Sequence, residues 1–135
     1  MIQFLVRSGI VLCLFMGIHA SLMAQATLRA DSTQILIGDH LGFILEVTQP
    51  ANGKVQWPLW EESLGELELI NYGPIDSSNS KLTQQLTVTA FDSGQFQVPA
   101  IELLVLTNEN SDSSYLRTNP ISIDVFTVPI DTTQG

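Results

Sequence analysis

Apolar and polar residues alternate along much of the chain, and this alternation predicts β-strands. In the clearest stretch, residues 41–48, every second side chain is apolar: Leu41, Phe43, Leu45 and Val47. A period of two places one face of a strand against a core and the other toward solvent. The pattern resumes at Leu82, and Leu86, Val88 and Ala90 share its apolar face. Both stretches are therefore predicted to be half-buried strands.

Shorter segments complete a set of about seven strands. They cover residues 27–37, 55–57, 67–70, 95–98, 101–107 and 121–128. The first is expected to break midway, and Pro58 ends the second. Residues 95–107 are interpreted as one strand broken at Pro99, where a shift in side-chain parity predicts a bulge. In the last strand, Ile123 and Val125 are expected to face inward.

Polar turn clusters separate these strands at intervals of roughly 8–12 residues. This spacing predicts an all-β fold, an immunoglobulin-like antiparallel β-sandwich over residues 27–129. Residues 130–135 follow as a C-terminal tail, interpreted as a truncated linker. Only residues 59–65 favour a helix, and they are expected to form a single turn that ends at Gly65.

A local motif supports the sandwich. Residues 91–96 form F-D-S-G-Q-F, the D-x-G-x-aromatic pattern of the corner that enters strand F in many sandwich domains. Asp92 is expected to accept hydrogen bonds from turn amides, and Gly94 to allow a positive φ. Phe96 is expected to pack beneath the corner.

The core is expected to hold together without sulfur. Val98 stands where an immunoglobulin domain has a disulfide cysteine, and Trp57 is expected on strand C against the core. The single cysteine of the chain is Cys13, in the N-terminal segment. Apolar contact between the sheets therefore replaces a disulfide bridge.

The first 26 residues have the pattern of a secretory signal peptide. Arg7 precedes an apolar run at residues 9–18, and small residues follow, ending in A-Q-A at 24–26. The run is about half of the roughly 20 residues that a membrane-spanning helix needs. We therefore expect a signal helix cleaved after Ala26, or alternatively after Ala24, and a mature chain without a membrane span.

Acidic residues dominate the charge of the chain. It holds 14 Asp and Glu against 5 Lys and Arg, a formal net charge of −9 at pH 7. Nucleic acids and anionic lipid surfaces bind clustered cations, so neither is an expected partner. With one cysteine and two histidines, no cysteine-rich zinc module is expected.

No residue pattern predicts catalysis or a cofactor. Four glutamates form an acidic group: Glu61, Glu62, Glu66 and Glu68. A solvated loop face explains them better than acid–base chemistry, because no cation or aromatic residue is patterned around them. His40 lies in a turn, without a serine or cysteine nucleophile in any known motif. Residues 108–112 imitate a calcium loop, but Ser113 and Asn119 stand where glycine and glutamate are required.

Three apolar residues are candidates for an interaction surface. Trp60 is interpreted as covering an open end of the sandwich, with an exposed recognition patch as the alternative. Phe126 and Val128 point to the outer face of the last strand, and an uncovered apolar edge often marks a missing neighbour. We therefore expect a protein partner there, while the oligomeric state stays open.

The order of several short motifs resembles the N-terminal module of BatD-like aerotolerance proteins of Bacteroidetes-type bacteria. The most specific motif is F-D-S-G-Q-F-Q-V-P at residues 91–99. Shorter matching segments occur at residues 35–39, 55–58, 75–77 and 125–132, so the resemblance spans almost all of the chain after residue 26.

This resemblance implies an exported, non-catalytic, immunoglobulin-like module in the periplasm of a Gram-negative envelope. It also implies membrane-associated protein partners, namely von Willebrand A-type membrane proteins and a MoxR-type ATPase system. Relatives continue toward a membrane anchor, so a chain that stops at Gly135 is expected to be a truncated product or a solitary module. The alternative is a calcium- or carbohydrate-dependent adhesion sandwich that uses Trp60, Tyr72 or chelating carboxylates.

Overall fold

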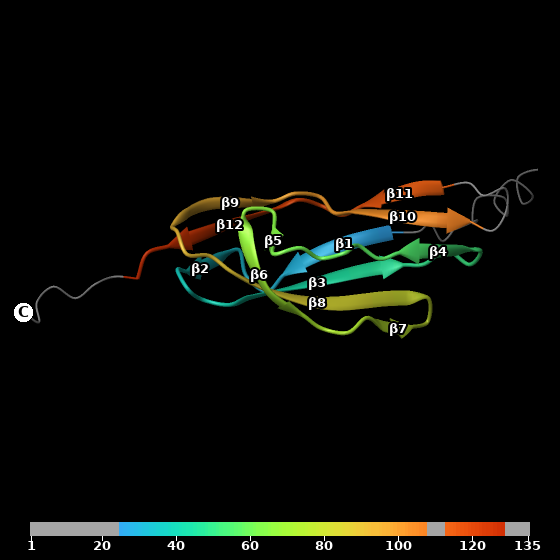
Figure 1. The fold of residues 1–135 in the computed structure, drawn as a ribbon, viewed down its shortest axis with the longest axis horizontal. Coiled ribbons are helices and arrows are strands. Elements are labelled where there is room, and N and C mark those ends of the chain that lie inside the picture. Colours follow the sequence, from blue (N-terminus) through green and yellow to red (C-terminus); the bar gives the residue numbers. More distant parts are fainter. Residues whose placement is uncertain (1–24, 108–112, 129–135) are drawn as a thin grey trace, which may run out of the picture.

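The computed structural model describes residues 25–107 and 113–128, and every regular element in these ranges is a β-strand (Figure 1). The strands are β1 (Gln25–Ala30), β2 (Gln34–Leu36), β3 (Leu41–Thr48), β4 (Gly53–Gln56), β5 (Ser63–Leu64), β6 (Leu67–Tyr72), β7 (Asp76–Ser78), β8 (Lys81–Thr89), β9 (Gly94–Val98), β10 (Glu102–Thr107), β11 (Ser113–Arg117) and β12 (Ile121–Phe126). The predicted all-β class is therefore confirmed.

The largest sheet has the order β1-β3-β8-β6-β5, and β7 also pairs with β8. In β3, buried and half-buried residues alternate along the whole strand, as the apolar period predicts. The turn from β7 into β8 contains Asn79 and Ser80, both with positive φ. Two such residues are typical of the type I′ turn that joins tightly paired strands.

Two smaller sheets follow the orders β11-β10-β4 and β2-β12-β9, and β2 is parallel to β12. They are successive parts of one long antiparallel ribbon, since β9 leads to β10 and β11 leads to β12. The register continues between them without a shift. Val98 pairs with Ile121, and four residues further along, Glu102 pairs with Arg117.

Proline explains why this ribbon is interrupted. In the continued register Pro99 falls opposite Pro120, and neither residue has an N–H group to donate to the ladder. The buried residues change from an even-numbered position before the break, Val98, to odd-numbered positions after it, Leu103 and Val105, as predicted. The predicted bulge is wrong, because both strands break together and neither gains an extra residue.

The predicted helical turn over residues 59–65 is also wrong. Residues 59–62 have no regular structure, and β5 and β6 meet at Gly65, whose φ is +64°. A Cβ atom at this position would lie 2.5 Å from the carbonyl oxygen of Gln97. Glycine is therefore needed both for the backbone conformation and for the approach of this turn to β9.

The predicted signal segment lies outside the described residues except for Gln25 and Ala26. Both belong to β1, where they pair with Thr48 and Val47. The expected cleavage after Ala26 would divide this strand, whereas the alternative after Ala24 would leave it whole.

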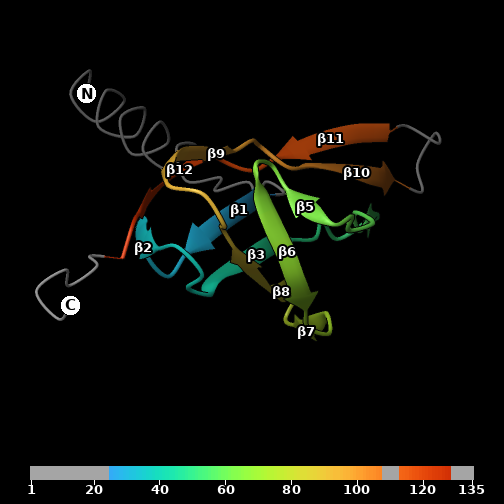
Figure 2. The same cartoon turned by 60° about the vertical axis from the view of Figure 1, so that its left-hand side comes forward.

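The three sheets enclose one hydrophobic core (Figure 2). Its largest fully buried side chain is Phe43 at the centre of β3. The inward residues of the last strand, Ile123 and Val125, are buried as predicted. Apolar contacts hold the sheets together in the described residues, which contain no cysteine.

An ion-pair group links the three strands β1, β3 and β8 on their outer face. The Glu46 carboxylate lies 2.9 Å from the Lys81 ammonium and 3.9 Å from the Arg29 guanidinium. The hydrogen bond from Lys81 lowers the pKa of Glu46 below its ordinary value, desolvation opposes this lowering, and the charges of Lys81 and Arg29 add to it.

Truncation of the central core residue is expected to destabilise the domain strongly. Phe43→Ala removes a fully buried aromatic ring, and such cavities cost about 3–5 kcal/mol. Ile44→Ala, on the half-buried face of the same strand, is the control and should cost about 1 kcal/mol or less. Urea unfolding measures both, and equal losses would contradict the placement of the core.

Protonation of Glu46 is expected to remove the stabilisation that its ion pairs supply. Because its pKa is lower in the folded state, this stabilisation is present above the unfolded pKa near 4.5 and is lost as the pH falls through the folded value. Glu46→Gln should cost at most about 1 kcal/mol at pH 7 and nothing near pH 2. The control is Glu68→Gln, at an exposed residue without an ion pair among the described residues.

Candidate functional site

The five residues predicted for the corner and the core differ in their burial. Val98 is fully buried, while Trp57 and Phe96 are half-buried and pack against the core. Gly94 has a φ of +139°, a conformation that favours glycine. Asp92 is exposed and forms no hydrogen bond with another described residue, so the predicted cap of the corner is absent there.

The two tryptophans share one buried acceptor that the sequence analysis did not identify. The indole N–H groups of Trp57 and Trp60 donate to the Gln84 side-chain oxygen at 2.5 and 2.7 Å. Gln84 is buried on β8, and its amide nitrogen donates to the Gly73 carbonyl at 2.7 Å. Trp60 is half-buried and packs against the core, so it covers the core rather than forming an exposed recognition patch.

This cluster holds the irregular segment that crosses between two sheets. Residues 57–62 lead from β4 to β5, and Gln84 fastens them to β8. The glutamine oxygen has two lone pairs, so it can serve both indole groups at once. All polar atoms of the cluster are engaged, which indicates a structural role.

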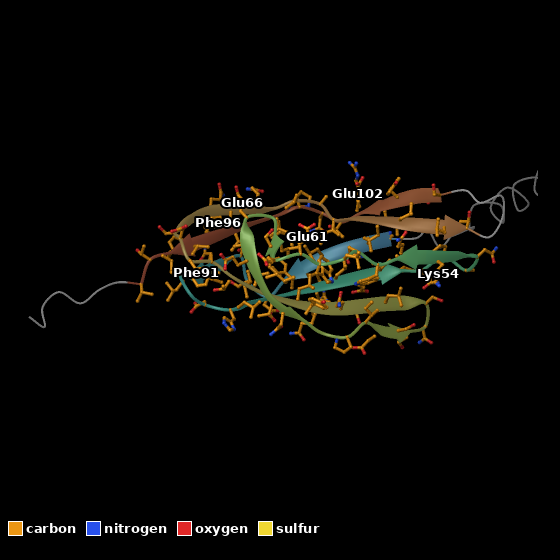
Figure 3. The ribbon with its side chains drawn as sticks, in the orientation of Figure 1. Lys54, Glu61, Glu66, Phe91, Phe96 and Glu102 are labelled. Carbon is orange, nitrogen blue, oxygen red and sulfur yellow. The ribbon has the colours of Figure 1, made fainter. Side chains whose placement is uncertain are left out.

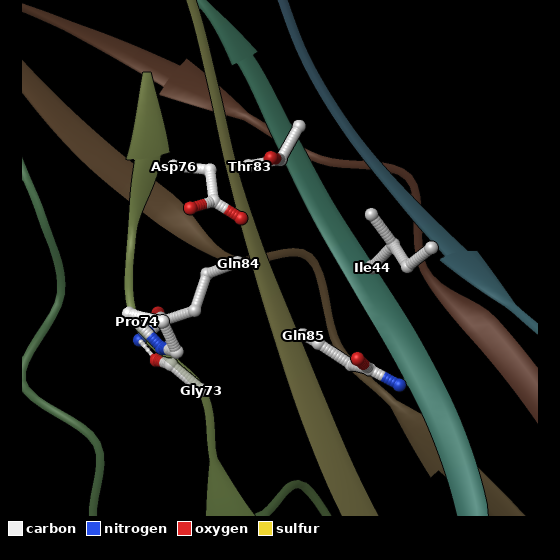
Figure 4. Close-up of a pocket in the computed structure, with 7 residues that line it drawn as sticks. All are labelled: Ile44, Gly73, Pro74, Asp76, Thr83, Gln84 and Gln85. Carbon is white, nitrogen blue, oxygen red and sulfur yellow. Dashed lines mark hydrogen bonds between the residues drawn. The ribbon is translucent and has the colours of Figure 1, made fainter.

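A pocket of about 230 Å³ lies beside Gln84, between β8 and the segment that leads from β6 to β7 (Figure 4). Its seven lining residues are Ile44, Gly73, Pro74, Asp76, Thr83, Gln84 and Gln85. Asp76 is the only one of these seven with an ionisable side chain.

The four glutamates of the acidic group and His40 are all exposed. Glu66 has a structural contact, because its carboxylate accepts the Gln97 backbone N–H at 3.0 Å. In Figure 3, Glu66 lies beside β9 and apart from Glu61. Glu66 is therefore engaged with β9, while Glu62 lies beside Glu68 on the β5-β6 hairpin.

The described residues show neither a metal-binding group nor a membrane-spanning helix. They contain no group of three or more His, Cys, Asp or Glu side chains placed to hold a metal ion. The imitation of a calcium loop at residues 108–112 lies outside the described residues. In the ranges that the structure covers, no helix is long and apolar enough to cross a bilayer.

The clearest candidate for function is an apolar surface at one end of the molecule. Four side chains form this end surface: Leu36, Phe91, Phe126 and Val128, with exposed fractions of 39, 63, 51 and 54%. Phe126 and Val128 are exposed as the sequence analysis predicted. Leu36 and Phe91 were not identified from the sequence, because their separate segments meet only in the fold.

Backbone contacts bring these segments together. Leu36 on β2 is the register partner of Phe126 on β12. The next residue, Ile37, donates its N–H to the Phe126 carbonyl at 2.9 Å. Gly38 then donates to the Ala90 carbonyl at 2.9 Å, which places the loop of Phe91 at the same end (Figure 3).

The rim of the end surface is acidic. A shallow hollow of about 530 Å³ adjoins Phe126, and Asp124 is among the residues that line it. The segments that form the surface and its rim, residues 36–40, 91–94 and 124–128, hold three aspartates and no lysine or arginine. An apolar centre with a polar rim is the usual composition of a protein-binding patch.

No protein-family model matches the chain, and no curated protein matches it.

Removal of the shared acceptor is expected to loosen the crossing segment. Gln84→Leu leaves two indole donors and the Gly73 carbonyl without their partner, a loss of about 2–3 kcal/mol. The chain contains only two tryptophans, so its emission reports on this cluster alone and should shift to longer wavelength. Gln85→Leu, at the exposed neighbouring position, is the matched control. Equal shifts in the two variants would refute this role.

Proposed function

We propose that the protein is an exported, non-catalytic, immunoglobulin-like interaction module that binds a membrane-associated protein through its end surface. The observation that carries the proposal is the cluster of exposed apolar side chains on three separate segments, around the paired residues Leu36 and Phe126. Exposed apolar surface is unfavourable in water, so a patch gathered from three segments favours a binding role.

The strand order supports an immunoglobulin-like arrangement. Neighbours in the large sheet, β1-β3-β8-β6, follow the A-B-E-D order of such domains, and β4-β10-β11 follows C-F-G. The twelve strands of the described residues correspond to the predicted seven when interrupted strands are counted once. The first strand then consists of β1 and β2, and the last two consist of β9 with β10 and of β11 with β12. Strands β5 and β7 are additions to this set. Apolar contacts between the sheets then take the place of the inter-sheet disulfide.

A non-catalytic role agrees with the surroundings of the titratable residues. The acidic group and His40 are exposed, and the pocket beside Gln84 contains a single carboxylate. An acidic rim favours a partner with lysine or arginine around an apolar centre. The BatD-like resemblance supports a periplasmic location and a von Willebrand A-type membrane protein, served by a MoxR-type ATPase system, as that partner.

Loss of an apolar side chain from the end surface is expected to weaken membrane association. Removal of a central anchor costs about 1–2 kcal/mol or more of binding free energy, which is about a tenfold lower affinity. Phe126→Ser should therefore release the protein from membranes of its own organism in a co-sedimentation assay. Leu59→Ser is the matched control, because Leu59 is 95% exposed and belongs to the segment between β4 and β5, which contributes no residue to the end surface.

A photo-reactive phenylalanine analogue at position 126 identifies the partner directly. We expect an adduct with a von Willebrand A-type membrane protein from position 126 and none from position 59. Unchanged co-sedimentation of Phe126→Ser, or equal labelling from both positions, would exclude the end surface as the binding site.

A further inference from the structure

On three edge strands, β1, β2 and β9, at least one outward residue has both its N–H and its C=O group bonded by a nearby residue. On β2 the Ser32 hydroxyl accepts the Gln34 N–H at 3.1 Å and donates to the Gln34 carbonyl at 2.9 Å. At Leu36 of the same strand, the N–H donates to the Asp39 carboxylate at 3.1 Å, and the carbonyl accepts the Asp39 N–H at 3.0 Å. No outward group of β2 is left to pair with another strand.

One outward residue on each of β1 and β9, Leu28 and Gln97, is bonded in the same way. The Asn119 amide accepts the Leu28 N–H at 3.2 Å and donates to the Leu28 carbonyl at 3.1 Å. The Gln97 N–H donates to the Glu66 carboxylate, and the Gln97 carbonyl accepts the Glu66 N–H at 3.4 Å. Such contacts protect an edge from pairing with another chain.

The remaining edges, apart from β11, are short or irregular. Strand β4 has four residues, with the exposed Lys54 among them, and β7 has three, with the exposed Asp76 among them. The register of β6 shifts between Leu69 and Asn71. Short length, a charged side chain and an irregular register each oppose strand addition.

Strand β11 is different, because its outward groups have no partner among the described residues. Thr118 donates its N–H to the Ile101 carbonyl at 3.0 Å, so the even-numbered residues of β11 bond to β10. By the alternation of an antiparallel ladder, Ser113, Tyr115 and Arg117 direct their N–H and C=O groups away from the sheet. Figures 1 and 2 both show β11 at the margin of the molecule, and β1 of the large sheet lies near its C-terminal end, around Leu116 and Arg117.

We propose that two copies of the chain associate through β11, in antiparallel pairing centred on Tyr115. The outward positions are symmetric about this residue. Tyr115 meets Tyr115 of the second copy, while Ser113 of each copy meets Arg117 of the other. Each of these is a hydrogen-bonded pair in which both residues exchange N–H···O=C bonds. The two three-stranded sheets then form one continuous sheet around a twofold axis.

The side chains of this edge are compatible with self-association. Tyr115 is 65% exposed and lies on the outer face beside its register partner Leu104. The pairing extends this apolar row across the axis, and aromatic cross-strand pairs stabilise antiparallel sheets. Although the chain has a net charge of −9, β11 contains no carboxylate, and its Arg117 is bonded to Glu102 at 2.7 Å. No like charges therefore face each other directly.

Cysteine substitution tests the pairing and its register together. The test uses the protein as it is recovered from cells. All variants also carry Cys13→Ser, so that the introduced cysteine is the only one in the chain. In a hydrogen-bonded pair the Cα atoms are about 5.5 Å apart, within the range of a disulfide. Tyr115→Cys should therefore form disulfide-linked dimers under mild oxidation. Ser113→Cys alone should not, because its two copies would be about 14 Å apart along the strand.

A mixture of Ser113→Cys and Arg117→Cys chains should cross-link, although neither does so alone. Tyr72→Cys, a similarly exposed tyrosine on β6, controls for random oxidation. In analytical ultracentrifugation, the unsubstituted protein should show a concentration-dependent dimer. Tyr115→Asp places two negative charges face to face and should weaken this dimer at least about tenfold, whereas Tyr72→Asp should not.

Several results would overturn the proposal. They are a monomer at all concentrations, equal cross-linking of Tyr115→Cys and Tyr72→Cys, or cross-linking of Ser113→Cys alone. Binding of another protein's strand at β11 by a monomeric chain would also refute it in favour of that occupant. None of these variants touches the end surface, so failure here and failure of the proposed function are separable.

Discussion

The opposition of Pro99 and Pro120 is the constraint on which much of this structure depends. A ladder in which neither residue can donate must break on both strands, yet the register survives because both strands are interrupted equally. The two halves of the ribbon then take different third strands, β2 on one side of the break and β4 on the other. The break also leaves Asn119 free of the ladder, and its amide reaches across to β1.

The sequence was most informative where one physical signal dominated. In β3 the strict alternation around Phe43 predicted both the strand and its buried face. The parity change near Pro99 was also visible, but its cause lay in Pro120, whose position opposite Pro99 depends on the pairing of distant segments. Strand β11 was missed because its serines continue a polar segment and offer no alternation. Residues 59–65 favoured a helix by composition, while the turn at Gly65 needed contacts with β9.

The end surface could be predicted only in part from the sequence. The outward parity of Phe126 and Val128 predicted their exposure, since it follows from the inward Ile123 and Val125. The contribution of Phe91 depends on the bond between Gly38 and Ala90, which no local pattern predicts. Gln84 occupies an inward position of β8, between the apolar residues Leu82 and Leu86 of the same face. A polar residue at such a position indicates a buried hydrogen-bonding group. Its donors, the two indoles, could be paired with it only in three dimensions.

The side chains that bond to the backbone of β2 also influence the solubility of the protein. Leu36 lies beside Phe126, both side chains are exposed, and an open edge with such residues is the kind of template from which cross-β fibrils grow. Ser32 and Asp39 satisfy the backbone of that edge while the apolar side chains stay exposed. The end surface can thus stay apolar and exposed without β2 acting as a template for aggregation.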